Sequence, residues 1–179
     1  MHLRNGGHGY GVVTKLLHWL TVLALATQFV IGYLMDADDG GQGRGRGRGQ
    51  GDESGRGRGR GGEEGYDVLD DTLVTVHVAL GVTILVLAVA RVAWRRSGGL
   101  PPWAERLTGG ERRLATWTER LLLASLFAIP ITGLALVRSG DDDALPFHVG
   151  AHLVFFAALA AHLGLVLGRR LLPRMLPAR

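Results

Sequence analysis

The stretch ALPFHVGAHLVFFAALAAHLGLVLG, residues 144–168, is 25 residues long and contains no charged residue. A membrane hydrocarbon core about 30 Å thick needs roughly 20 residues of helix, so this stretch can cross a bilayer. It also carries three histidines, His148, His152 and His162. Ionisable side chains are rare inside membranes and usually mark functional positions, because burying them in lipid is costly. The stretch therefore predicts both a membrane span and a site built from imidazoles.

Three other uncharged runs, residues 16–35, 72–90 and 121–137, are 20, 19 and 17 residues long. Backbone polar groups in lipid must be hydrogen-bonded within the chain, so each run is expected to be helical. We expect a kink rather than a break at Pro130 in the third run. The predicted fold class is all-α, a four-helix transmembrane bundle within one membrane domain covering residues 1–179. Its helices are expected at about 14–35, 72–93, 118–138 and 144–170.

The basic residues predict the orientation of this bundle. The segments expected on the side of the two termini contain 13 of the 20 lysines and arginines, and the two opposite loops contain 7. The positive-inside rule therefore places both termini in the cytoplasm. We expect a multi-pass protein in the inner, or plasma, membrane of a prokaryote.

The loop at residues 36–71 is expected on the outside of the membrane, and it contains the run GRGRGRGQGDESGRGRGR. Such a composition cannot bury a core, so it predicts a flexible, disordered, solvated segment. Gly-Arg repeats can bind RNA, but an external position argues against a nucleic-acid partner. The chain has no cysteine, which excludes disulfides, iron–sulfur clusters, thiolate zinc sites and covalent c-type haem.

Five of the seven histidines lie in the apolar runs: His18, His77, His148, His152 and His162. A single histidine there could be an interhelical hydrogen-bonding contact. Five across three helices, without cysteine, favour metal or haem ligation, because neutral imidazole is the ligand of b-type haem iron. His2 and His8 precede the first run in a Gly-rich segment, and we expect them to be solvated.

Helix geometry sorts the intramembrane histidines into two levels. His148 and His162 are fourteen residues apart, which is about 21 Å along the helix and about 40° around it. His77 lies about 9 Å from the outer end of its helix and His148 about 7.5 Å, so these two are predicted to form the outer pair. His18 and His162 are predicted to form the inner pair. His152, one turn from His148, is the alternative outer ligand.

The arrangement resembles the prokaryotic cytochrome b561 family of four-helix, di-haem membrane proteins. The resemblance covers nearly the whole chain except residues 36–66. The chain departs from the family in its Gly-Arg loop, in the extra His152, and in Arg120, where many relatives have a histidine. The similar pieces are Tyr10-Gly11, LLHWL at 16–20, Gln28, Gly32, Met35, HVALG at 77–81, Arg91, Trp94, Arg95, Pro101-Pro102, AIPITG at 128–133, His148 and His162.

The resemblance implies two non-covalent b-type haems, with axial ligands His18, His77, His148 and His162, and electron transfer involving quinone. The expected partners are the lipid bilayer, a quinone or quinol, and a redox partner protein or small oxidant, with a homodimer left open. A quinone-linked oxidoreductase of a respiratory chain fits this pattern. The alternative is a haem-free membrane anchor or transporter that uses its histidines as polar contacts or a proton relay.

Overall fold

The computed structural model describes residues 2–7, 9–42, 72–139 and 142–176, with only the backbone described for residues 36–42 and 142. In this part of the chain four helices form an all-α bundle: α1 Val12–Gln42, α2 Thr72–Gly98, α3 Gly109–Ser139 and α4 Leu145–Gly168. Two short 3₁₀ helices, η1 Asp142–Ala144 and η2 Leu172–Arg174, flank α4. Each of the four α-helices is long and apolar enough to cross a membrane. The predicted four-helix membrane fold is thereby confirmed.

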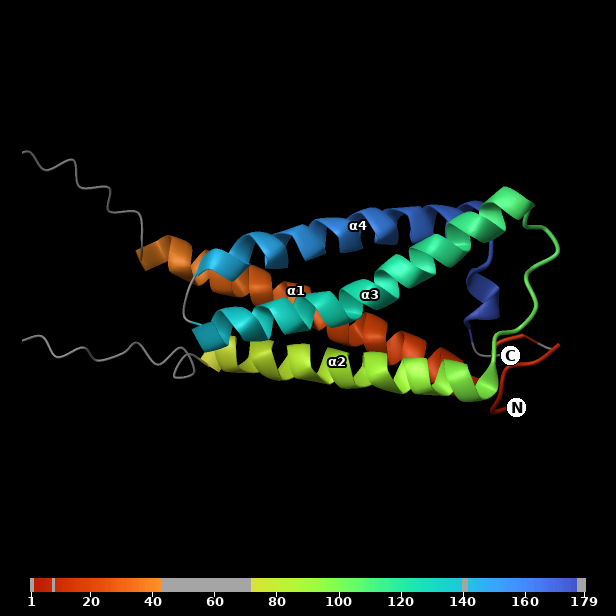
Figure 1. The fold of residues 1–179 in the computed structure, drawn as a ribbon, viewed down its shortest axis with the longest axis horizontal. Helices are drawn as coiled ribbons and strands as arrows, with labels where there is room; N and C mark the ends of the chain where they lie inside the picture. Colours follow the sequence, from red (N-terminus) through yellow and green to blue (C-terminus); the bar gives the residue numbers. More distant parts are fainter. Residues whose placement is uncertain (1, 8, 43–71, 140–141, 177–179) are drawn as a thin grey trace, which may run out of the picture.

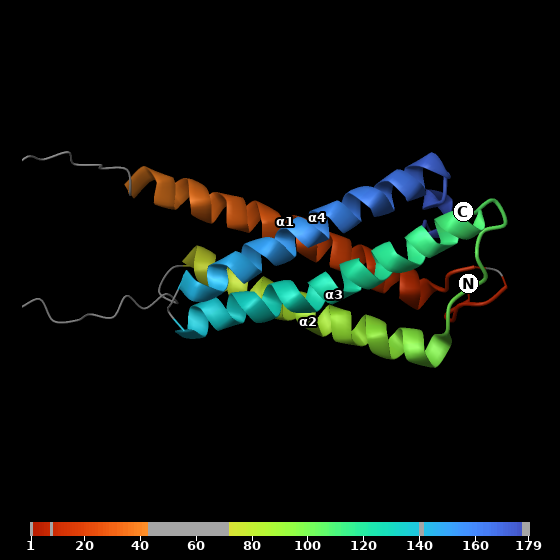
Figure 2. The same ribbon diagram turned by 45° about the horizontal axis from the view of Figure 1, so that its top comes forward.

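The helices run along one long axis, and both chain ends lie at the same end of the bundle as the α2–α3 connection (Figures 1 and 2). We call this the terminal end, and the opposite end, where α2 begins and α3 meets α4, the loop end. The main helix contacts are α3 with α4, α1 with α2, and α2 with α3. The Gly-Arg run expected to be a flexible loop lies outside the described residues, although α1 itself continues to Gln42.

Little apolar surface is enclosed in the described part of the bundle. The buried cluster consists of Ile84, Ala88 and Leu126. By contrast, the side chains of Leu23, Leu153 and Phe147 are 65%, 67% and 71% exposed. Large apolar groups turned outward suit a surface in contact with lipid tails, which are as apolar as the side chains themselves.

Helix α3 begins at Gly109, before the apolar run that it contains, because Thr108 and Glu111 cap it. The Thr108 backbone N–H and hydroxyl both donate to Glu111 Oε2, at 2.8 and 2.9 Å, and the Glu111 N–H lies 3.4 Å from Thr108 Oγ1. This reciprocal pair is a capping box, which satisfies free donors at a helix start. The helix then passes through the buried Pro130 as a single element.

The N-terminal segment is tied to the terminal end by Asn5. Its side-chain amide donates to the Gly99 carbonyl at 2.8 Å, and its Oδ1 accepts from the Gly11 N–H and the Thr14 hydroxyl. A side chain at Gly11 would collide with the backbone, because an added Cβ would lie 2.4 Å from the Leu3 carbonyl oxygen. Glycine is therefore required where the segment doubles back onto α1.

The C-terminal segment closes the same end from the other side. Lys15 Nζ donates to the Leu176 carbonyl at 2.6 Å, and Trp19 Nε1 donates to the Met175 carbonyl at 3.0 Å. Arg174 donates to the Pro102 carbonyl at 2.7 Å. Both chain ends thus pack against the helix ends and form walls of the space between them.

Candidate functional site

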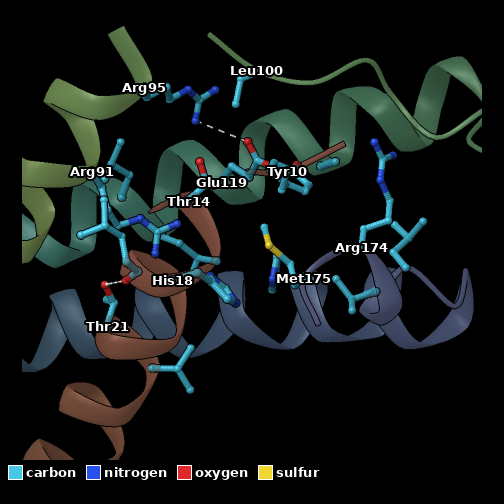
Figure 3. A pocket seen from close by; sticks show the side chains of 18 of the residues that line it. Tyr10, Thr14, His18, Thr21, Arg91, Arg95, Leu100, Glu119, Arg174 and Met175 are labelled. Atoms are coloured by element: carbon cyan, nitrogen blue, oxygen red, sulfur yellow. Dashed lines mark hydrogen bonds and ion pairs between the residues drawn. The ribbon is translucent and has the colours of Figure 1, made fainter. Parts of the chain in front are cut away.

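A cavity of about 470 Å³ lies between the helices at the terminal end (Figure 3). His18 of α1 and His162 of α4 both line it, so the structure brings the two predicted inner histidines to one space. Most of the remaining wall is apolar. The apolar lining side chains include Leu17, Val22, Leu25, Leu122, Leu123, Leu126, Phe155, Leu159, Leu163 and Val166.

The end of the cavity nearest the chain termini is polar. Arg95 of α2 forms an ion pair with Glu119 of α3 at 3.4 Å, and the Arg174 guanidinium lies 5.6 Å from the centre of the Tyr10 ring. All four side chains line the cavity (Figure 3). Burial raises the pKa of the Tyr10 hydroxyl, and the Glu119 carboxylate raises it further. Tyr10 therefore remains a neutral phenol that can donate a hydrogen bond into the cavity.

One ring nitrogen of His18 forms no hydrogen bond with the described residues. This atom, Nδ1, is buried. His18 and His162 lie close enough to interact electrostatically, and Arg91 lies within reach of each of them. Two imidazoles from different helices that line one cavity can both donate nitrogen ligands to a group held between them.

His77, on α2, packs against α1 near the loop end. A Cβ added to Gly32 would lie only 3.4 Å from His77 Cε1 and 3.8 Å from Nδ1, so the imidazole sits directly on the bare backbone of α1. One turn away the glycine is on α2 and the side chain on α1: the Gln28 amide nitrogen lies 3.8 Å from the Cβ position of Gly81. The two glycines let the helices approach closely around the histidine.

His148 is held by α3 through a hydrogen bond and a glycine. Its Nδ1 lies 2.9 Å from Thr132 Oγ1, and a Cβ on Gly133 would lie 3.2 Å from its Cε1. The Thr132 hydroxyl also lies 2.8 Å from the Ala128 carbonyl and 3.0 Å from that of Ile129, so a carbonyl is available to accept its proton. In the tautomer with the proton on Nδ1, His148 donates to Thr132 and keeps Nε2 as a lone-pair donor for a metal.

His152 lies next to His148, with ring centroids 4.5 Å apart in an edge-on arrangement. On its other side it contacts Phe29 of α1, at 5.7 Å between centroids. It lies within electrostatic reach of both His77 and His148. The loop end therefore gathers three histidines from α2 and α4, of which His148 is the one with a protein group orienting its ring.

These donors suit haem better than a bare ion. No group of three or more His, Asp or Glu side chains in the described residues could hold a metal ion. Haem iron already has four ligands from its macrocycle and needs only one or two axial imidazoles. A largely apolar cavity lined by two histidines, one of which has a buried nitrogen without a hydrogen-bond partner in the described residues, fits that requirement.

The family model for prokaryotic cytochrome b561 matches residues 9–178, nearly the whole chain. The chain belongs to this family. It is accordingly a multi-pass membrane protein whose function is electron transfer through b-type haem. No curated protein and no solved structure gives a significant match to the cytochrome.

Thr132 and Gly133, which contact His148, are among the residues near the predicted ligands to which sequence reasoning assigned no role. Both lie in the AIPITG motif, which the sequence offered only as part of the family resemblance. A threonine and a glycine in a membrane helix also serve ordinary helix packing, so their contact with His148 emerges only in three dimensions. Of the two remaining histidines, His2 is exposed, and His8 lies outside the described residues.

Proposed function

We propose that this cytochrome binds two non-covalent b-type haems, the terminal-end haem between His18 and His162 and the loop-end haem between His77 and His148. The proposal is supported chiefly by the presence of two separate histidine groups at opposite ends of one bundle. His148 and His162 lie on the same helix about 21 Å apart, so the two sites span much of the bilayer. His152 is the alternative ligand at the loop end.

Each bound haem supplies a one-electron redox couple, and the chain supplies the surroundings that make it usable. The imidazoles would hold the haem, and the hydrogen bond between His148 and Thr132 would fix the orientation of that ring. Apolar residues of α1, α3 and α4 supply most of the wall of the terminal-end cavity. The two chain ends, through Asn5 and Met175, pack over its mouth.

We propose that electrons move between a membrane quinone pool and a partner protein or small oxidant, across the plasma membrane of a prokaryote. The terminal end, where most of the arginines gather, is the cytoplasmic end by the positive-inside rule. The family match supports electron transfer in a membrane, and quinone is the lipid-soluble carrier expected from the family resemblance.

Haem content of the purified full-length protein tests the proposal. A pyridine haemochrome assay against protein mass should give two haems per chain, released without cleaving any covalent bond. Reduction by a water-insoluble quinol should then develop the spectrum of a six-coordinate, low-spin b-type cytochrome. A ratio near one would contradict the two-site assignment. A protein without Soret absorption would favour the haem-free anchor or transporter.

A further inference from the structure

Arg91, on α2, differs from the other cations around the terminal-end cavity. Arg95 is paired with Glu119, and Arg174 with the Tyr10 ring and the Pro102 carbonyl. Arg91 lines the same cavity and is half-buried, yet no hydrogen bond or ion pair joins it to any other described residue. A guanidinium in that position carries five donors and a permanent charge with no partner.

An unpaired charge away from water is costly, so this arginine needs an anion. Glu119 is the acid nearest to it, but that carboxylate already serves Arg95 at 3.4 Å. With Arg91, Arg95 and Arg174 facing it and only Glu119 as a carboxylate, the cavity carries an excess of positive charge. A second carboxylate entering the cavity would reduce this excess.

The position of Arg91 indicates where that carboxylate comes from. Arg91 lies within electrostatic reach of both His18 and His162, and its side chain extends from α2 into the cavity toward His18 (Figure 3). A cation close to both imidazoles is close to whatever is held between them. Haem b carries two propionate carboxylates, and guanidinium binds carboxylate through two parallel hydrogen bonds.

We propose that Arg91 is a carboxylate-binding residue of the terminal-end site and that its partner is a propionate of the haem bound there. This inference rests on the proposed function, because it requires a haem between His18 and His162. It assigns to Arg91 a binding role, and to Arg95 the separate task of joining α2 to α3 through Glu119.

The test compares Arg91→Gln with Arg96→Gln in the full-length protein. Arg96 is on the same helix end and carries the same charge, but it is exposed and does not line the cavity. Arg91→Gln should lower the midpoint potential of the terminal-end haem, since a lost cation favours ferric iron, and should speed transfer of that haem to apomyoglobin about tenfold, as expected for one charge-assisted hydrogen bond. Arg96→Gln should change neither quantity.

Reconstitution with haem dimethyl ester, whose propionates are blocked, identifies the carboxylate. In the wild type the ester should lower the retention of the terminal-end haem, and with the ester the wild type and Arg91→Gln should become equal. If the glutamine variant does not fold, Arg91→Lys replaces it: the charge and therefore the potential should be kept, while the loss of the two parallel hydrogen bonds should still lower retention of haem but not of the ester. An undiminished difference between wild type and variant with the ester would overturn the assignment and indicate a free anion or lipid phosphate instead.

The two proposals fail in different ways. If the wild type shows no redox wave that is lost in His18→Ala, the terminal-end haem itself is wrong. If that wave exists and Arg91→Gln leaves both its potential and its haem retention unchanged, only the role of Arg91 is wrong.

Discussion

His148 and His152 lie one helical turn apart on α4, and at the scale of single residues their surroundings distinguish them. His148 Nδ1 forms a hydrogen bond with Thr132, which occupies that nitrogen and leaves Nε2 available as a ligand. His152 rests on Phe29 and on the edge of His148 instead. Such a hydrogen bond behind a metal-binding histidine fixes its tautomer and orientation, so His148 is the better-prepared ligand.

We therefore expect His148→Ala to convert the loop-end haem to a high-spin form or to lose it, because one axial ligand is removed. His152→Ala should keep a low-spin loop-end haem with a shifted midpoint potential. Electron paramagnetic resonance of the two ferric variants measures the difference. A high-spin signal from His152→Ala, with His148→Ala unchanged, would make His152 the ligand.

Thr132→Val should remove the acceptor behind His148 while conserving side-chain shape. The imidazole then becomes a weaker electron donor, so we expect a higher midpoint potential at the loop-end haem and about tenfold weaker haem retention. Thr83→Val is the matched control, because the Thr83 hydroxyl also bonds back to a helix carbonyl, that of Ala79 at 2.8 Å, but on an exposed face. Equal potentials in the two variants would show that the Thr132 contact does not reach the iron.

At the scale of helices, glycines allow the neighbouring helix to pack directly against the imidazoles of His77 and His148. Gly32 of α1 faces His77, and Gly133 of α3 faces His148. In both places the imidazole of one helix occupies the volume that a Cβ of its neighbour would take. The helix contacts α1–α2 and α3–α4, which are the most extensive in the bundle, are thus the contacts that carry the loop-end histidines.

Gly133→Val should displace His148, since even a Cβ would lie 3.2 Å from its Cε1 and the two methyl groups need more room. The expected result is a loop-end haem with reduced occupancy and partial high-spin character, and an unchanged terminal-end haem. Gly164→Val is the control on α4, where an added Cβ meets nothing within 4 Å and which lies far from His148. Haem quantitation and spectra of the two variants give the answer; a normal loop-end haem in Gly133→Val would mean that His148 is not fixed by α3.

At the scale of the whole molecule, the bundle could be predicted because the lengths of the uncharged runs match the thickness of the membrane hydrocarbon core. Uncharged runs near 20 residues have few alternatives to spanning helices. The grouping of His18 with His162, and of His77 with His148, followed from helical rise alone. Those groupings agree with where the structure places the side chains, while their role as ligands stays a prediction.

Other features could not be predicted from the sequence, because they depend on contacts between distant segments. The start of α3 was expected at about 118, but the capping box at Thr108 extends the helix to Gly109. The pairing of Glu119 with Arg95, and not with Arg91, depends on which arginine faces it across the interface of α2 and α3. Periodicity along one helix contains no information about the charge on its neighbour.

The two-site organisation makes one prediction for the molecule as a whole: His18→Ala and His77→Ala should remove different haems. His18 lines the terminal-end cavity, and His77 packs on Gly32 near the other end of α1, so loss of one imidazole leaves the other site intact. Each variant should retain a single redox wave, and the two waves should have different midpoint potentials, because the terminal-end site is flanked by arginines whose charge favours ferrous haem. Spectroelectrochemical titration of the purified variants measures both. If His18→Ala and His77→Ala lose the same wave, both histidines serve one haem, and the separation of the sites along the bundle has to be abandoned.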